Sequence, residues 1–187
     1  MLDSHKHIEG SNFACRLLKR EMTPYQYYVY LSNQLLCYYV LESAASNRGL
    51  LDGLEDIKRS TSISRDLTEL EREYGFDLVA RLESTDKYIN HINTISTDPD
   101  RLMAHIYVRH MGDLSCGQKL KELVPGSGLY YMFNGDVDVL KDKIHEKLHD
   151  GMADEANTCF NMIHVFFKEL DTTFDCAGIP DKGVKTT

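Results

Sequence analysis

Several features that would restrict the class of this protein are missing from its sequence. No stretch approaches the roughly 20 apolar residues that a membrane-spanning helix needs, so we expect no membrane span. The first residues contain no apolar run either, so we expect no signal peptide. The formal net charge of −8 argues against non-specific nucleic-acid binding, which requires a basic surface. We therefore expect neither a membrane nor a nucleic acid among the partners.

The cysteines form no recognisable disulfide or metal-binding pattern. There are five, an odd number, and no two of them are arranged as Cys-x-x-Cys. This spacing argues against a disulfide framework and against a cysteine-rich zinc site, and it is typical of proteins in a reducing compartment. We therefore predict a cytoplasmic protein.

Helix-breaking residues are scarce as well, with four prolines in 187 residues, and no internal repeat is visible. Apolar side chains recur at three- and four-residue intervals, which is the spacing of one face of an α-helix. We predict an all-α fold, a single-domain bundle of several helices over residues 1–175, followed by a polar, flexible tail over residues 176–187. The helices are expected at about residues 4–19, 24–46, 65–74, 85–96, 98–123, 136–149 and 153–173.

Two of these helices begin at strong local signals, Thr23-Pro24 and Asp98-Pro99. A threonine or aspartate side chain caps the free N–H groups of a first helical turn. Proline at the first helical position gives up no N–H group that the helix needs. These two helix starts are therefore the most specific structural predictions that the sequence allows.

The most distinctive stretch runs from Ala104 to Gln118. It lies within a predicted helix, yet Gly112 and Gly117 each cost about 1 kcal/mol there relative to alanine. Two such costs indicate that a flat group needs the backbone close, or that the helix bends. Asp113 places a carboxylate beside the first glycine, where it could hold water. Close packing of two helices, with Asp113 on the surface, explains the pattern equally well.

The order of residues in this stretch resembles the distal-helix signature of the biliverdin-producing heme oxygenases. The matching string is His-x-Tyr-x-Arg-x-x-Gly-Asp-Leu-Ser-x-Gly-Gln. The resemblance implies a bundle in which heme b is sandwiched between a proximal and a distal helix. It implies that the backbone at Gly112 lies over the heme face and that Asp113 holds, through water, the hydrogen bonds that deliver a proton during oxygen activation. Tyr107 and Arg109 would lie near the heme edge.

The resemblance extends to the N-terminal part of the chain in an ungapped register. In that register His5 is the axial ligand of the heme iron, and Glu9 follows one helical turn later. Neutral imidazole is a common ligand of heme iron. His7 is the alternative ligand, and a solvated histidine near the terminus is the alternative interpretation of His5. Tyr38 matches a tyrosine of the distal hydrogen-bond network, although packing in the core would also explain it.

Two further groups of residues are expected around the heme. Cys116 stands where the family usually has glycine, so its thiol is expected to crowd the distal pocket or to move the helix bend toward Gly117. We expect a thiol packed near the heme, and thiolate ligation by Cys116 is the alternative. Phe160 and Phe167 match phenylalanines that line the family's pocket.

The heme propionates are expected to meet basic side chains near residues 140–147. Lys141 falls on a basic position of the family, whereas His145 replaces the arginine that the family generally has. Lys143 or Lys147 could take over that contact. Lysines on a solvated helix face are the alternative interpretation of all these positions.

The resemblance implies an enzyme that cleaves heme, its cofactor and substrate, with O₂ and external electrons. The products would be biliverdin, with IXα as the family norm, CO and ferrous iron. Because the sequence contains no G-x-G-x-x-G fingerprint for a redox cofactor, a ferredoxin or a reductase is expected as electron donor, and a bilin reductase could follow. We expect a monomer. A heme-binding or storage protein without turnover is the alternative.

A second motif, His145-Glu146-x-x-His149, matches that of zinc hydrolases. On a helix it places two histidines on one face for Zn²⁺, with the glutamate as general base. The surrounding residues are highly charged, no strand is predicted beside the helix, and a third ligand is not evident apart from the distant Glu169. We therefore expect this match to be accidental.

Overall fold

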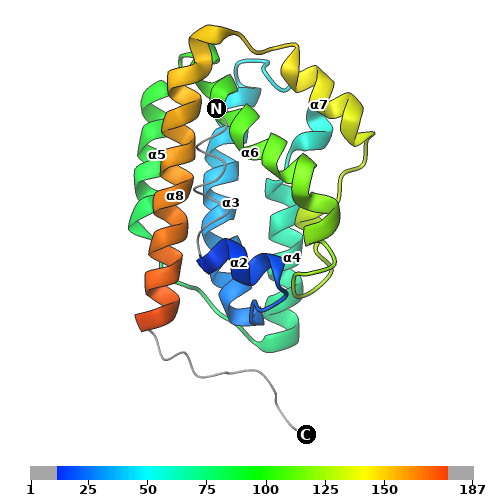
Figure 1. Cartoon of the computed structure of the whole chain (residues 1–187), viewed down its shortest axis with the longest axis vertical. Coiled ribbons are helices and arrows are strands. Elements are labelled where there is room, and N and C mark those ends of the chain that lie inside the picture. Colours follow the sequence, from blue (N-terminus) through cyan, green and yellow to red (C-terminus); the bar gives the residue numbers. More distant parts are fainter. Residues whose placement is uncertain (1–11, 177–187) are drawn as a thin grey trace, which may run out of the picture.

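The computed structural model describes residues 12–176, and these form helices and no strand (Figure 1). This confirms the predicted all-α fold. The α-helices are α2 (Asn12–Leu18), α3 (Pro24–Ser46), α4 (Ser60–Tyr74), α5 (Glu83–Ile95), α6 (Pro99–Leu120), α7 (Val137–His145) and α8 (Ala153–Cys176). Three short 3-10 helices connect them, η1 (Glu55–Ile57), η2 (Leu129–Tyr131) and η3 (Asp150–Met152). The first half of the helix expected at residues 4–19 lies outside the described residues, as does the predicted tail beyond residue 176.

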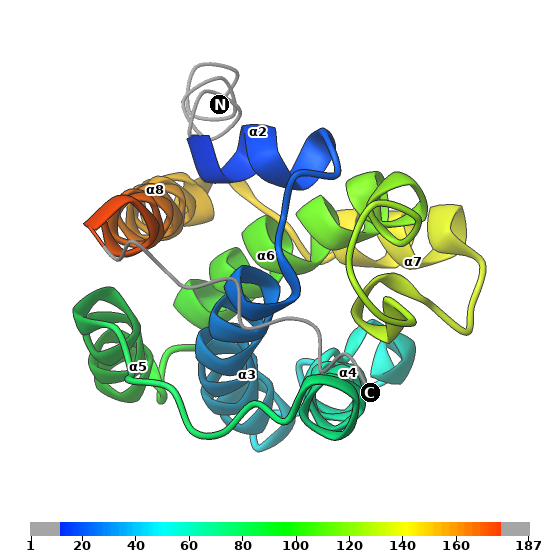
Figure 2. The ribbon, with the colours of Figure 1, turned by 90° about the horizontal axis from the view of Figure 1, so that it is seen from below.

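Helix α6 runs through the middle of the molecule (Figure 2). It contacts α3, α5, α7 and α8, and α2 lies on the opposite side of it from α3. Apolar side chains of α6, among them Leu102 and Ile106, are fully buried in a core that also contains Leu41 of α3 and Ile92 of α5. Each such side chain contributes about 1.5–3 kcal/mol to folding. Within residues 12–176 no helix combines the length and the apolar character that a bilayer crossing requires.

Helices α3 and α6 begin where the local signals predict. The Thr23 side chain accepts a hydrogen bond from the Gln26 backbone N–H, and the Gln26 side chain accepts one in return from the Thr23 N–H. Asp98 accepts a hydrogen bond from the Arg101 backbone N–H at 3.1 Å. Both predicted helix starts are therefore confirmed, because the residues that cap these helices are adjacent to them in the sequence.

Helices α4 and α5 begin earlier than predicted, because residues far away in the sequence cap them. Glu42, near the C-terminal end of α3, accepts hydrogen bonds from the backbone N–H groups of Arg59 and Ser60 at the start of α4. Glu169 of α8 accepts hydrogen bonds from the backbone N–H groups of Glu83 and Ser84 at the start of α5. Since no residue next to either helix supplies the cap, the sequence pattern places both starts too late.

Helix α7 ends at His145, so the prediction of a helix as far as residue 149 was wrong in its last turn. Backbone hydrogen bonds from Lys147 to Ile144 and from Leu148 to His145 tighten the chain into a turn. His149 is extended and pairs with Asp100 at the start of α6, at 3.2 Å. His149 therefore contacts α6 and does not extend α7.

Arg59 holds together two segments that connect helices, one around η1 and one around η2. Its guanidinium group donates hydrogen bonds to the backbone oxygens of Ile57, Tyr130 and Met132, and to that of Asp56. The group also stacks on the Phe133 ring, 3.9 Å from its centroid. Arg59 is 3% exposed, so it satisfies buried carbonyl groups that solvent does not reach.

Replacing Arg59 by methionine, which keeps much of the volume, is expected to lower the free energy of unfolding by about 3 kcal/mol or more. The reason is that more than one buried carbonyl oxygen then lacks a donor, at about 1–3 kcal/mol each. Urea denaturation followed by circular dichroism measures the change. Arg65→Met, at an exposed position of α4, is the matched control, and an equal effect of the two substitutions would contradict this role of Arg59.

Candidate heme site

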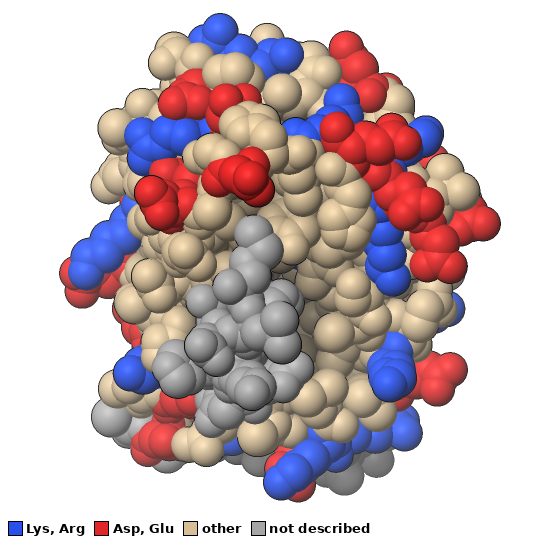
Figure 3. Space-filling view, turned by 45° about the horizontal axis from the view of Figure 1, so that its top comes forward, with Lys and Arg blue, Asp and Glu red and all other residues tan. Residues whose placement is uncertain are grey.

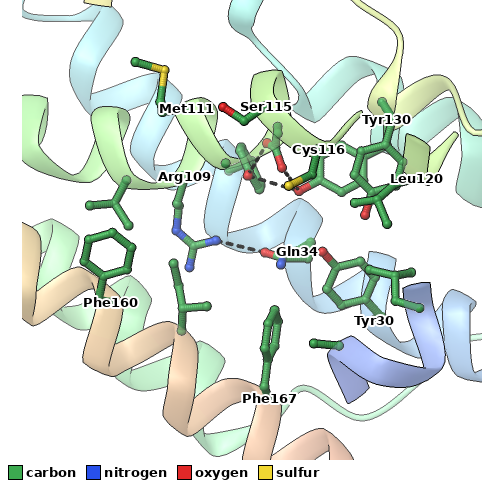
Figure 4. A pocket seen from close by; sticks show the side chains of 18 of the residues that line it. Tyr30, Gln34, Arg109, Met111, Ser115, Cys116, Leu120, Tyr130, Phe160 and Phe167 are labelled. Atoms are coloured by element: carbon green, nitrogen blue, oxygen red, sulfur yellow. Dashed lines mark hydrogen bonds between the residues drawn. The ribbon is translucent and has the colours of Figure 1, made fainter. Parts of the chain in front are cut away.

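A cavity of about 490 Å³ lies between α6 on one side and α2 and α8 on the other (Figure 4). Its volume is in the range of small-molecule binding sites. Figure 3 shows a hollow whose visible wall carries no charged side chain, while acidic and basic side chains gather around its rim. The cavity is lined by Ala14, Leu17, Leu18, Tyr30, Gln34, Tyr38, Tyr107, Val108, Arg109, Met111, Gly112, Asp113, Ser115, Cys116, Leu120, Tyr130, Tyr131, Phe160, Ile163 and Phe167.

The two glycines of α6 have different surroundings. Gly112 lines the cavity, and a Cβ atom added to it would have no neighbour within 4 Å. A flat group can therefore lie against the bare backbone at this point. Gly117 is not among the lining residues, and an added Cβ atom would lie 3.2 Å from the backbone oxygen of Tyr131. The structure thus places Gly112 against the cavity and Gly117 against η2.

Asp113 is held between two tyrosine hydroxyl groups. Tyr38 donates a hydrogen bond to Asp113 Oδ2 at 2.5 Å, and Tyr130 donates one to Oδ1 at 3.0 Å. The two hydroxyl oxygens are themselves 3.0 Å apart. A carboxylate can accept about four hydrogen bonds, so Asp113 keeps acceptor capacity for water in the cavity that it lines.

Burial controls the protonation of this group of side chains. It raises the pKa of the Asp113 carboxyl, and the opposing effects of the Tyr38 hydrogen bond and the neighbouring His110 do not cancel the shift. Burial, followed by the negative charge of Asp113, raises the pKa of Tyr38 and of Tyr130 well above the ordinary value. Both tyrosines therefore keep their protons, and Asp113 takes up a proton more readily than an exposed carboxylate.

Arg109 brings a buried cation to the cavity wall. Its guanidinium group donates a hydrogen bond to Gln34 Oε1 at 2.9 Å, as Figure 4 shows, and lies over the Tyr88 ring, 4.0 Å from its centroid. Its Nε–H group has no acceptor among the described residues. Because arginine stays charged even when buried, this group adds a fixed positive charge to the cavity wall.

Most of the residues predicted from the sequence lie around one cavity. Tyr38, Arg109, Gly112 and Asp113 line it, together with Tyr107, Cys116, Phe160 and Phe167. These eight positions come from helices α3, α6 and α8, which are far apart in the sequence. The predicted axial ligand His5, its alternative His7 and the neighbouring Glu9 lie outside the described residues.

The residues predicted for the propionates do not line the cavity. Lys141 pairs with Asp138 at 3.8 Å, and Lys143 donates a hydrogen bond to the backbone oxygen of Gly53. The ring of His145 lies 6.2 Å from that of Tyr107, which does line the cavity. The contact of His145 with Tyr107 therefore reaches the cavity wall, whereas the contacts of the two lysines with Asp138 and Gly53 do not.

The second motif does not form the geometry of a zinc hydrolase. Since α7 ends at His145, the two histidines do not share a helix face, and His149 is paired with Asp100. Glu169 caps α5 through the backbone N–H groups of Glu83 and Ser84. The match of His145 to His149 with the zinc motif is thus a coincidence of sequence.

Comparisons with known proteins identify the family of this chain. The family model described as heme oxygenase matches residues 2–132. A heme oxygenase of Guillardia theta is 30% identical over 196 residues, covering 91% of this chain and 83% of that protein. The chain belongs to the heme oxygenase family. Like its relatives it is a heme-degrading oxygenase, with heme as substrate and cofactor and O₂ as oxidant.

Solved heme oxygenases have the same fold. The structure of heme oxygenase from Leptospira interrogans matches with a TM-score of 0.78 at 25% identity, covering 89% of this chain and 94% of that one. Heme oxygenase-1 from Synechocystis, solved in complex with heme, matches with a TM-score of 0.80 at 24% identity, covering 94% of this chain and 90% of the other. The likeness extends over nearly the whole length of both structures.

The residues of the cavity suit heme. The lining is largely apolar and aromatic, as a large flat ring requires, and the bare backbone at Gly112 gives close access from one side. The polar groups gather at Asp113 and Arg109, on the same helix as Gly112. Gly112 faces open space, which close packing of another helix at this position would not leave.

Sequence reasoning missed Tyr130 and Gln34. Tyr130 lies in η2, a short aromatic segment with no helical periodicity, and only the fold brings its hydroxyl group to Asp113. Gln34 is a single polar residue on a helix rich in tyrosine, and its contact with Arg109 joins α3 to α6. Neither position carries a local signal, because both contacts cross between elements far apart in the chain.

Gly112→Ala is expected to raise the free energy of unfolding by about 1 kcal/mol, since alanine is the better helix former and its Cβ atom meets no neighbour. The same atom would stand between the helix and a bound heme, so hemin affinity is expected to fall roughly tenfold, or about 1.4 kcal/mol. Urea denaturation and hemin titration measure the two effects.

Gly117→Ala is the matched control for this substitution. Its Cβ atom would lie 3.2 Å from the Tyr131 oxygen, so it is expected to stabilise the protein less while leaving hemin affinity nearly unchanged. Equal effects of the two substitutions on hemin affinity would contradict the assignment of Gly112 to the heme face.

Proposed function

We propose that this heme oxygenase converts heme to biliverdin, CO and ferrous iron, with Asp113 as the residue that manages the protons. The observation that carries the proposal is the buried Asp113 carboxylate, which lines the cavity beside Gly112 and is held by Tyr38 and Tyr130. A storage protein has no evident need for a proton-holding carboxylate at this position. A heme-cleaving enzyme does, because oxygen activation consumes protons.

When bound, heme supplies both the iron that activates O₂ and the ring that is oxidised. The protein contributes the surroundings. Its carboxylate at Asp113, with a pKa raised by burial, holds water in the cavity and passes on a proton. The hydroxyl groups of Tyr38 and Tyr130 keep both carboxylate oxygens in one orientation, so the remaining lone pairs are directed in a fixed way.

Other lining residues orient the substrate. Phe160 and Phe167 of α8 contribute apolar surface opposite α6, which excludes bulk water from the heme. Arg109 adds a positive charge inside the wall, where it stabilises negative charge that develops during the reaction. His145 and Lys141 are proposed to meet the propionates at the rim, and this contact would select the IXα isomer.

The electrons are proposed to come from a ferredoxin or a reductase that docks near the exposed heme edge, and a bilin reductase could use the product. The axial ligand is proposed to be His5. The cytoplasmic location and the monomeric state stay predictions from the sequence.

Turnover is tested by adding a ferredoxin system or ascorbate to the hemin complex. The Soret band is expected to disappear while a bilin absorbance grows, and in Asp113→Ala the rate of bilin formation is expected to fall at least ~100-fold, the usual contribution of a positioned acid. Tyr130→Phe, which removes one of the two hydroxyl contacts, is expected to give a smaller loss.

Hemin titration of the same variants separates proton delivery from heme binding. Asp113→Ala is expected to bind hemin as the unmodified protein does, and Asp52→Ala, an exposed substitution outside the cavity, to turn over normally. Normal bilin yield from Asp113→Ala would refute its role. A persistent ferrous–O₂ spectrum in the unmodified protein would favour heme storage.

His5→Ala tests the proposed ligand. The low-spin, six-coordinate ferric spectrum of the hemin complex is expected to disappear, because the imidazole ligand is gone. Circular dichroism should show an unchanged helical fold. An unchanged heme spectrum would assign the ligand instead to His7 or Cys116, which His7→Ala and Cys116→Ala then distinguish.

A further inference from the structure

A second group of metal-ligating side chains lies outside the heme cavity. His91 of α5, His105 of α6 and Glu155 of α8 converge on one point. The Nε2 atoms of His91 and His105 lie 2.5 Å and 2.9 Å from the same oxygen, Glu155 Oε1. The three potential ligand atoms all lie within 4.8 Å of one another. None of the three residues lines the heme cavity.

The outer atoms of two of these side chains are already held. His105 Nδ1 lies 3.1 Å from the Tyr88 hydroxyl group, and Arg101 Nε donates a hydrogen bond to Glu155 Oε2 at 2.7 Å. In metal sites the ligating histidine and carboxylate have such partners on their far side, which orient them and leave the near atom for the metal. The remaining ligand atoms, His105 Nε2 and Glu155 Oε1, face each other and the His91 ring.

The group is also accessible from one side. The His105 side chain is fully buried and that of Glu155 is 10% exposed, whereas that of His91 is 19% exposed. An ion can therefore enter past His91, and water can complete its coordination. Sites with three protein ligands and an open position are common for transition metals.

We propose that His91, His105 and Glu155 form a binding site for a divalent first-row transition metal ion. Two imidazoles and one carboxylate are the ligands that suit Zn²⁺, Fe²⁺ and Co²⁺, whereas Ca²⁺ and Mg²⁺ require mainly oxygen ligands. A bound ion would join side chains from three helices, α5, α6 and α8. Two of them continue into the cavity wall, α6 to Arg109 and α8 to Phe160, so the ion would also stabilise the wall of the heme site.

The alternative is a hydrogen-bond cluster in which both histidines donate to Glu155 and no metal binds. His91→Gln separates the two, because glutamine keeps an N–H donor for Glu155 but is a poor ligand for these ions. His149→Gln is the matched control, since His149 is another histidine paired with a carboxylate, that of Asp100.

The experiment uses the full heme-free chain, freed of metal with a chelator. Calorimetric titration with Zn²⁺ and the visible absorption of added Co²⁺ measure binding. One equivalent is expected to be lost, or weakened at least ~100-fold, in His91→Gln but not in His149→Gln, and Tyr88→Phe should weaken it by roughly 10- to 100-fold. Zn²⁺ should raise the Tm of the unmodified chain and of His149→Gln, but not that of His91→Gln.

The comparison between variants also allows for metal binding by the other histidines, including those outside the described residues. Such binding is the same in His91→Gln and in the unmodified chain, so only the difference of one equivalent counts. Equal Zn²⁺ binding and an equal Tm shift in the two proteins would overturn the proposal, as would an unmodified chain that binds no Zn²⁺.

Discussion

Backbone N–H groups at the start of a buried helix need acceptors, and carboxylates from other helices supply several of them in this protein. Glu42 of α3 caps α4, Glu169 of α8 caps α5, and Asp66 of α4 accepts hydrogen bonds from the backbone of η2. Each of these contacts fixes the direction in which one element leaves another. The positions of α4, α5 and η2 depend on them, because a buried N–H group without an acceptor costs about 1–3 kcal/mol.

One of these contacts also affects the heme site, because it holds the backbone of Tyr130. Asp66 accepts a hydrogen bond from its backbone N–H, and Arg59 donates one to its backbone oxygen. With the main chain held on both sides, the Tyr130 hydroxyl group reaches Asp113 without freedom to turn away. The orientation of Asp113 therefore rests on charged side chains that never touch the cavity, and contacts of this kind outside a site are what make it rigid.

Local signals account for the parts of the fold that could be predicted. Thr23-Pro24 and Asp98-Pro99 mark the starts of α3 and α6 correctly, since capping residue and helix are neighbours in the chain. The start of α4 was placed five residues late, because its cap is Glu42, seventeen residues before Arg59. The last turn predicted for α7 is absent: the chain turns after His145 through hydrogen bonds of Lys147 and Leu148, and His149 pairs with Asp100 on another helix.

By itself the sequence determined the all-α fold, the family and the eight predicted residues that line the cavity, because periodicity and a long specific motif are local properties of the chain. Only the tertiary structure decided that Gly112 faces open space while Gly117 faces Tyr131, and that Tyr130 shares Asp113 with Tyr38. It also decided that His91, His105 and Glu155 meet. These arrangements follow from the packing of helices distant in sequence, and no spacing along the chain encodes that packing.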